Sequence, residues 1–228
     1  MTEPLIVITG ASSGIGAATA KVFSDIGYIV AMLSRNKKSM EQFHIPNSIA
    51  IECDITDIES VKNAINLAQE KFGAIDCLIN NAGFAKGGEF TEMSHDDNQK
   101  MIAVNLNGVI NCIETVLPIM QKNKSGTIIN ISSVADRKSR PTLPVYAATK
   151  AAIKSLSESL RTSNAKYGIR ICNVAPAKIK TPMLMSSNLS NDQIIEVEDM
   201  AKAILWIYQQ PKTVCIRDIV IAPTHYEA

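Results

Sequence analysis

Short apolar runs alternate with longer amphipathic segments along this chain. Seven runs rich in β-branched residues indicate buried strands, at 5–8, 28–33, 47–53, 75–79, 128–132, 169–175 and 218–222. Segments with a helical spacing of apolar residues occupy 17–26, 96–122, 143–166 and 198–209. Because strands that alternate with helices form a parallel sheet covered on both faces, the pattern predicts a doubly wound α/β fold of about seven strands.

Composition and charge narrow the possible partners. No linker, repeat or shift of composition divides the 228 residues, so residues 1–228 are expected to form a single domain. A net charge of +1 lacks the basic excess of a nucleic-acid-binding protein, and the first apolar run is too short for a membrane span. Five cysteines without a Cys-x-x-Cys pair favour buried thiols in a reducing compartment, which predicts a cytoplasmic protein. The isolated His44, His95 and His225 predict no metal site.

A glycine-rich turn joins the first predicted strand to the first predicted helix. Its sequence is Thr9-Gly10-Ala11-Ser12-Ser13-Gly14-Ile15-Gly16. Glycines permit a tight turn and a close approach of backbone to ligand, and a helix N-terminus offers free N–H groups to phosphate. The turn is therefore predicted to bind the pyrophosphate of a dinucleotide, through Gly10, Ser12, Ser13, Gly14, Ile15 and Gly16.

Tyr146 and Lys150 stand four residues apart in the predicted helix 143–166, so their side chains share one face. A nearby ammonium lowers the pKa of a phenol, and a phenol tuned in this way exchanges protons with a carbonyl or alcohol oxygen. Ser133, at the end of a predicted strand, is placed to hydrogen bond the same oxygen. The three residues are therefore candidates for proton-transfer chemistry.

The same tyrosine–lysine spacing occurs a second time, at Tyr208 and Lys212. Pro211 lies between the two residues and should end the helix near Gln210, so no shared face is assured. Tyr208 is therefore interpreted as the polar end of an apolar helix.

With these motifs together, the chain resembles a short-chain dehydrogenase/reductase over nearly its whole length. The resemblance implies a Rossmann fold in which Tyr146 is the general acid or base and Ser133 positions the substrate oxygen. It also implies that Lys150 lowers the pKa of Tyr146 and binds the nicotinamide ribose, and that Asn105 holds a water in the proton relay. Asp54 matches the residue that meets the adenine, and Thr181 the residue that binds the carboxamide. The other matching cofactor positions are Ile55, Asn81, Ala82, Gly83, Pro176 and Ile179.

The residues after the second predicted strand bear on the choice of nicotinamide. An acidic residue at this point typically binds the ribose 2′-hydroxyl of NAD. This chain has Ser34 there, followed by Arg35, whose guanidinium can hold a 2′-phosphate. NADP(H) is therefore favoured, with NAD(H) as the alternative. The other interpretation of Arg35, Lys37 and Lys38 is a solvated basic loop.

The substrate side departs from the family pattern in several places. A short apolar lid is predicted at 181–196, and Ala177 stands where relatives commonly have glycine. Asp136 replaces another frequent glycine, soon after Ser133. The basic loop 137–140 has two interpretations, a solvated surface loop or a site that attracts an anionic substrate.

These features predict an NADP(H)-dependent carbonyl reductase or alcohol dehydrogenase that acts on a small molecule. The rival is a nucleotide-binding sensor or scaffold with little turnover, against which the retention of all four catalytic positions argues. A sugar-nucleotide epimerase is weaker, because such relatives carry a larger carboxyl-terminal substrate domain. The predicted helices 96–122 and 143–166 have more apolar residues than one face requires, which favours a homodimer, with a tetramer as the alternative.

Overall fold

The computed structural model describes residues 3–184 and 193–226. This part of the chain contains a seven-stranded sheet in the order β3-β2-β1-β4-β5-β6-β7, and every neighbouring pair of strands is parallel. The strands are β1 (Leu5–Thr9), β2 (Ile29–Ser34), β3 (Ser48–Glu52), β4 (Ile75–Asn80), β5 (Gly126–Ile131), β6 (Ile169–Pro176) and β7 (Asp218–Ile221). The predicted doubly wound parallel sheet is confirmed.

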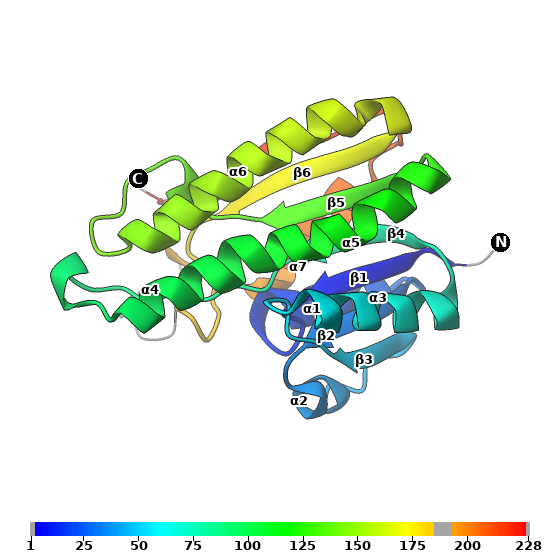
Figure 1. Cartoon of the computed structure of the whole chain (residues 1–228), viewed down its shortest axis with the longest axis horizontal. Coiled ribbons are helices and arrows are strands. Elements are labelled where there is room, and N and C mark those ends of the chain that lie inside the picture. The colour runs from blue at the N-terminus through cyan, green and yellow to red at the C-terminus, as the bar shows by residue number, and fades with distance from the viewer. Residues whose placement is uncertain (1–2, 185–192, 227–228) are drawn as a thin grey trace.

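Helices cover both faces of the sheet (Figure 1). They are α1 (Gly14–Asp25), α2 (Lys37–Glu41), α3 (Ile58–Phe72), α4 (His95–Ile102), α5 (Gly108–Asn123), α6 (Pro144–Asn164) and α7 (Val197–Gln209). Short helical turns are η1 (Phe90–Glu92), η2 (Ala103–Asn107), η3 (Val134–Asp136) and η4 (Ala165–Tyr167). Figure 1 looks onto the face covered by α3, α5 and α6, whereas α1 and α7 pack together on the opposite face.

The central strand β1 shows why the apolar runs are continuous. Successive side chains of a strand point to opposite faces of the sheet. Leu5 and Val7 pack into the layer beneath α3, α5 and α6, whereas Ile6 and Ile8 pack into the layer beneath α1 and α7. All four side chains are fully buried. A strand covered on both faces has no polar side, so it lacks the alternation of an exposed strand.

Two of the predicted helices differ from the sequence-based prediction, and α2 and α3 lie where no helix was predicted. α1 begins at Gly14 rather than at residue 17, so the last two glycines of the turn belong to the first helical turn. The helix predicted at 96–122 spans His95–Asn123, but the π-helical turn η2 interrupts it. Hydrophobic spacing does not distinguish a single π turn from an α turn, so the sequence did not show the interruption.

The segment His95–Asn123 is also long and apolar enough to cross a membrane, by length and composition alone. The core helix of a soluble protein passes the same test. In this fold the segment packs against α3, α6, β4 and β5, as a core helix does.

The order in which strands are added to the sheet changes direction at β1, and this change determines where the site lies. From β1 the chain first builds outward through β2 and β3, and it then returns to add β4 on the other side of β1. The loops that leave β1 and β4 therefore diverge at the carboxyl edge of the sheet. In doubly wound sheets ligands bind in the crevice that this divergence opens.

Buried Arg170 of β6 closes the end of α7. Its guanidinium donates hydrogen bonds to the Thr127 hydroxyl at 2.8 and 3.1 Å, to the Tyr208 carbonyl at 2.8 Å and to the Gln210 carbonyl at 2.7 Å. The last carbonyls of a helix lack partners within the helix and carry partial negative charge. Arg170 satisfies two of them and compensates its own burial.

Arg170→Lys is expected to lower the free energy of unfolding by roughly 2–4 kcal/mol, because one ammonium cannot reach all these oxygens and leaves buried acceptors unpaired. Thermal unfolding should show a midpoint lower by roughly 4–16 °C. The matched control is Arg217→Lys, whose exposed side chain pairs with Glu158, and its cost should stay below about 0.5 kcal/mol. Equal effects of the two substitutions would contradict the structural role of Arg170.

Candidate active site

The glycine turn after β1 packs closely against the end of β4. Gly10 has a φ of +66°, and a Cβ added there would stand 2.7 Å from the Cα of Ala82. A Cβ on Gly16 would stand 2.5 Å from the side-chain nitrogen of Asn81 and 2.5 Å from the Gly10 carbonyl oxygen. No real Cβ tolerates such contacts with backbone, so both positions require glycine. The turn therefore presents bare backbone at the start of α1.

Hydrogen bonds fasten this turn to β4. The backbone N–H groups of Asn81 and Ala82 both donate to the Thr9 hydroxyl, each at 3.1 Å. The Asn81 side-chain amide donates to the carbonyls of Thr9 and Gly10, at 3.0 and 3.2 Å. The predicted cofactor residues Asn81 and Ala82 thus lie directly beside Gly10 and fix the shape of the turn.

Ser12, Ser13, Gly14 and Ile15 complete the turn and the start of α1. Ser13 is the N-cap residue, and its side chain makes no capping hydrogen bond. No acidic residue lies in the first turn of α1, so no carboxylate of that turn offsets the positive end of the helix dipole. This end of α1 therefore attracts a phosphate.

The ends of β2 and β3 bring Ser34, Arg35 and Asp54 together. The Ser34 carbonyl accepts a hydrogen bond from the Cys53 N–H at 3.0 Å, which places the next residue of each strand side by side. Burial opposes ionisation of Asp54, but hydrogen bonds from Thr56 and the charge of Arg35 hold the pKa of Asp54 below its ordinary value. Arg35 itself is exposed and forms no ion pair within the described part of the chain, whereas Lys37 pairs with Glu41.

Three predicted cofactor residues are buried in the packing of the fold. The Ile55 side chain packs on Gly108 of α5, and its carbonyl accepts a hydrogen bond from Asn111 at 2.9 Å. Pro176 is the last residue of β6 and pairs with β7, while the Ile179 side chain lies in the layer beneath α1 and α7. The side chains of these three residues are therefore engaged in packing. Only their backbone atoms are left to contact a cofactor.

Thr181 lies beside the glycine turn. Its Cγ2 would be 3.2 Å from a Cβ on Gly14, so the loop after β6 touches the glycine turn. The lid predicted at 181–196 is described only near its ends, and Met185 and Leu189 fall outside the described residues. Ile195 exchanges backbone hydrogen bonds with Lys178 and Lys180, both at 2.9 Å, so the segment leaves and rejoins the fold at one place.

Ser133, Tyr146 and Lys150 meet at the carboxyl end of β5. Ser133 follows this strand, and its hydroxyl hydrogen bonds with the half-buried Tyr146 phenol. Lys150 is buried one turn further along α6, with its Nζ 5.7 Å from the centroid of the Tyr146 ring. This Nζ donates a hydrogen bond to the Ile131 carbonyl at 2.8 Å. The structure thus brings together the three residues that the sequence singled out.

Burial dominates the ionisation of this pair. Burial raises the pKa of Tyr146 above its ordinary value; the Ser133 hydrogen bond opposes the rise and the Asp136 charge adds to it. Burial also lowers the pKa of Lys150 to about 8, although the Asp136 charge opposes that shift. The prediction of a lowered tyrosine pKa is therefore wrong for this arrangement, because burial of the phenol raises its pKa.

Asn105 lies fully buried in η2 and holds the loop that follows β4. Its Oδ1 accepts a hydrogen bond from the Phe84 N–H and its Nδ2 donates to the Phe84 carbonyl, both at 2.8 Å. The same Nδ2 reaches the Thr149 hydroxyl at 3.3 Å. The side-chain amide of Asn105 therefore holds the loop after β4 in place.

The predicted Gly83 packs between the two buried polar residues of the site. A Cβ on Gly83 would lie 3.5 Å from Asn105 Oδ1 and 3.9 Å from Lys150 Nζ. The loop after β4 therefore connects the glycine turn, through Asn81 and Ala82, with the catalytic candidates.

The buried Asp136 anchors the turn that carries Ser133. Its carboxylate accepts hydrogen bonds from Arg137, at 2.6 and 3.2 Å, and from Asn173 at 2.9 Å. Arg137 and Asn173 also bind Asp218 at the start of β7, at 2.7 and 2.8 Å. A glycine at position 136 could not form this network. With Asp136 there, the Ser133 turn is tied to β6 and β7.

Sequence analysis missed four residues that shape the site, namely Thr9, Phe84, Ile131 and Thr149. Phe84 and Ile131 act through backbone atoms, for which the residue type carries no signal. Thr149 bonds to the Tyr146 carbonyl at 2.7 Å and to Asn105, and its place beside Lys150 was the available sequence signal.

The second tyrosine–lysine pair has the structural role expected from the sequence. Tyr208 is buried, and its hydroxyl donates to Asp76 at 2.6 Å. Burial and this hydrogen bond raise the pKa of Tyr208 far above its ordinary value. Lys212 instead binds the Ser125 hydroxyl at 3.1 Å.

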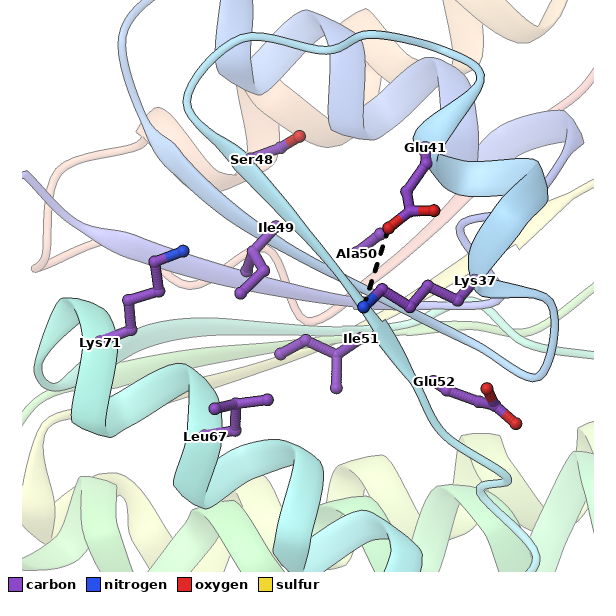
Figure 2. Close-up of a pocket in the computed structure, with 9 residues that line it drawn as sticks. All are labelled: Lys37, Glu41, Ser48, Ile49, Ala50, Ile51, Glu52, Leu67 and Lys71. Atoms are coloured by element: carbon purple, nitrogen blue, oxygen red, sulfur yellow. Dashed lines mark ion pairs between the residues drawn. The ribbon is translucent and has the colours of Figure 1, made fainter.

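A shallow hollow of about 680 Å³ lies along the outer edge of β3, apart from the residues above (Figure 2). Lys37 and Glu41 form an ion pair across it at 3.7 Å, and Leu67 and Lys71 of α3 form one side. Its charged residues and Ser48 lie apart from the glycine turn and from Tyr146, so the hollow is not assigned to the active site. Within residues 3–184 and 193–226, no group of three or more His, Cys, Asp or Glu is arranged to hold a metal ion.

Comparison with known proteins identifies the family. Residues 4–192 match the family described as short chain dehydrogenase. An uncharacterized oxidoreductase of Staphylococcus aureus (strain USA300) is 31% identical, with 98% of each chain covered. The chain therefore belongs to the short-chain dehydrogenase family and is an oxidoreductase.

Solved structures share the fold over nearly the whole chain. The structure described as ElxO with NADP bound is 31% identical, with a TM-score of 0.89 and 97% of each chain covered. A 3-ketoacyl-(acyl-carrier-protein) reductase from Brucella melitensis, complexed with NADH, is 26% identical, with a TM-score of 0.92 and 97% of each chain covered. The predicted Rossmann-type fold is thus confirmed.

Proposed function

We propose that this oxidoreductase transfers a hydride between NADP(H) and a carbonyl or secondary alcohol group, with Tyr146 as the general acid or base. The observation that carries the proposal is the convergence of Ser133, Tyr146 and Lys150 beside a turn that requires glycine. Two structural relatives are described with NADP and with NADH, which supports a nicotinamide cofactor.

The residues around the turn fit a nicotinamide dinucleotide. Gly10 and Gly16 leave space that a side chain would fill, and α1 begins there without an acidic side chain. The pyrophosphate would lie on this turn, the adenosine beside Arg35 and Asp54, and the carboxamide near Thr181. These are the places where the sequence-based assignment puts them.

When bound, the nicotinamide supplies or accepts the hydride, and the protein supplies orientation and the proton. In reduction, the carbonyl oxygen would accept a hydrogen bond from Ser133 and the phenolic proton of Tyr146. The product is the alcohol, and the resulting phenolate is stabilised by the nearby Lys150 ammonium. Oxidation reverses these steps, with Tyr146 as the base.

The ionisation of the pair favours the reductive direction at neutral pH. A raised pKa keeps Tyr146 protonated, so it is ready to donate. With a pKa of about 8, Lys150 is mainly charged at pH 7 and loses its charge in mildly basic solution. The site is therefore prepared for proton donation.

The rival function is a nucleotide-binding sensor with little turnover. A sensor needs the glycine turn but has no use for a phenol, a hydroxyl and a desolvated ammonium gathered at one place, since burying that ammonium costs stability. The clustering of Ser133, Tyr146 and Lys150 therefore favours the enzyme. Structural relatives are named for different substrates, so their names supply no common substrate for this chain.

Tyr146→Phe should reduce carbonyl turnover by roughly a hundredfold or more, because the ring remains and only the acid is lost. NADPH binding should persist. The control is Tyr208→Phe, which alters the other tyrosine–lysine pair and should retain turnover despite some loss of stability. Steady-state kinetics on both purified variants makes the comparison, and near-normal turnover of Tyr146→Phe would exclude the role.

The rate of carbonyl reduction should fall as pH rises through about 8. Lys150 is positively charged below its pKa and neutral above it, and that pKa is lowered to about 8. The charge that stabilises the Tyr146 phenolate is therefore lost over this range. Lys150→Arg should move the fall to higher pH, whatever its effect on the maximal rate, because guanidinium stays charged. A profile of kcat/KM that is flat from neutral to strongly basic pH would contradict the lysine's role.

NADPH should bind more tightly than NADH, and Arg35 should be the main cause. A charge-assisted hydrogen bond to the 2′-phosphate is worth about 1.5–3 kcal/mol, or roughly 10- to 150-fold in affinity. Arg35→Ala should remove most of this preference and leave NADH binding nearly unchanged. Lys38→Ala should have a smaller effect that salt screens. Nicotinamide fluorescence titrations measure the affinities of wild type and both variants for each cofactor, and equal weakening of both cofactors by Arg35→Ala would refute the assignment.

The chain should form a two-fold dimer through an apolar groove between α4 and α6. Ile102, Leu106, Pro144, Val145, Ala148 and Thr149 line this groove. Light scattering should give about twice the 24.7 kDa chain mass at micromolar concentration. Ala148→Arg should yield monomers, because it puts a charge into the contact, while Leu67→Arg on exposed α3 should not. A monomeric wild type would rule out the dimer.

A further inference from the structure

Tyr226, near the end of the described chain, lies between two cationic side chains. The Arg140 guanidinium donates a hydrogen bond to the Tyr226 hydroxyl. Lys178 Nζ stands 5.9 Å from the centroid of the same ring. A backbone hydrogen bond from the Tyr226 N–H to the Pro223 carbonyl, at 3.0 Å, holds the tyrosine in a turn. All three side chains belong to partly buried residues, so they are not freely solvated surface groups.

These residues come from three segments that leave the same edge of the sheet. Arg140 lies in the loop between Ser133 and Tyr146, and its carbonyl accepts a hydrogen bond at 2.9 Å from Leu143, the N-cap residue of α6. Lys178 follows the end of β6, and Tyr226 follows the end of β7. The carboxyl ends of β5, β6 and β7 lie together, on the side of the catalytic candidates that is away from Arg35. The three residues therefore flank the substrate side of the site.

Among the described residues, the donors of this cluster lack matching acceptors. Because the Tyr226 oxygen accepts from Arg140, the hydroxyl proton of Tyr226 is left to be donated elsewhere. Among residues 3–184 and 193–226, no carboxylate lies within ion-pair distance of Arg140 or Lys178. The nearby basic residue Arg137 is different, since its charge is balanced by Asp136 and Asp218.

We propose that Arg140, Lys178 and the Tyr226 hydroxyl form an oxyanion-binding site that selects carbonyl substrates bearing a carboxylate or phosphate group. This inference rests on the proposed function for its carbonyl chemistry. A guanidinium offers a planar pair of donors to such a group, and Lys178 adds a second positive charge. The hydroxyl of Tyr226 supplies a neutral donor whose position Arg140 fixes. The sequence allowed two interpretations of the basic loop 137–140, and this proposal assigns Arg140 of that loop to the substrate site.

Matched substrates that differ in charge test the selection. Acetoacetate should be reduced with a higher kcat/KM than ethyl acetoacetate, or dihydroxyacetone phosphate than dihydroxyacetone, by at least about tenfold. The two pairs distinguish a carboxylate site from a phosphate site. Arg140→Gln should lower the value for the charged substrate by roughly 10- to 150-fold and leave the neutral one within about twofold. Tyr226→Phe should lower it by roughly 2- to 13-fold.

The control variant is Lys71→Gln, at the end of α3 that lies away from the catalytic edge, and it should behave as wild type with every substrate. Equal rates for charged and neutral partners, or equal losses for both in Arg140→Gln, would overturn the proposal. Reduction of neutral carbonyls without any preference for the charged ones would leave the proposed function standing and remove only the oxyanion site.

A binding measurement that needs no turnover tests the oxyanion site independently of the proposed carbonyl chemistry. Calorimetric titration of the protein with butyrate, butyramide and inorganic phosphate should show binding of at least one anion and not of the amide. Arg140→Gln should weaken that binding by at least about tenfold, and Lys71→Gln should not. Anion binding that depends on Arg140 in a protein that reduces no carbonyl would support the site and refute the proposed activity. No difference between wild type and Arg140→Gln would refute the site.

Discussion

The contact between the ends of β1 and β4 is the constraint on which the rest of the site depends. The Thr9 hydroxyl accepts hydrogen bonds from both Asn81 and Ala82, and Gly10 packs on Ala82 so closely that no side chain fits between them. This contact closes the turn over the start of α1. It also directs the chain after β4 toward Asn105 and Lys150, as the position of Gly83 shows. The glycine turn and the catalytic candidates therefore both depend on this contact between the ends of β1 and β4.

Beyond this contact, buried polar groups hold the catalytic candidates in place. Asn80 of β4 donates to Asn130 of β5 at 2.9 Å, and Asn130 donates to Ser157 of α6 at 2.9 Å. These bonds cross from the sheet to the helix that carries Tyr146 and Lys150. Since buried polar groups destabilise the fold unless they are paired, such a network favours one register of helix on sheet. The orientation of α6 is thereby fixed by more than apolar packing.

The sequence predicted the parts of this structure that depend on local pattern. Strands buried on both faces appear in the sequence as continuous apolar runs. The turn from Gly10 to Gly16 appears as three glycines within seven residues. The shared face of Tyr146 and Lys150 followed from their separation of four residues within the predicted helix 143–166. Each of these features is visible within a few neighbouring residues, which is why each could be anticipated.

The features that escaped prediction involve residues distant in sequence or backbone atoms. Nothing near Asn105 indicates that its amide closes on the backbone of Phe84, or that a π turn forms there. The tyrosine pKa was predicted from the nearness of Lys150, but burial has the larger effect, and burial depends on the whole fold. Tyr226 shows the same limit, because its contact with Arg140 joins residues 86 positions apart.

Two arginines of the loop beside the site differ in whether their charge is balanced by a carboxylate. Arg137 lies between Asp136 and Asp218, and together they bind the Ser133 turn to β6 and β7, so this arginine is already satisfied by the fold. Arg140, three residues later, makes its described hydrogen bond to a neutral hydroxyl. A neutral partner positions a guanidinium without cancelling its charge. One loop can therefore use its first arginine to stabilise the catalytic turn and its second to attract a substrate anion.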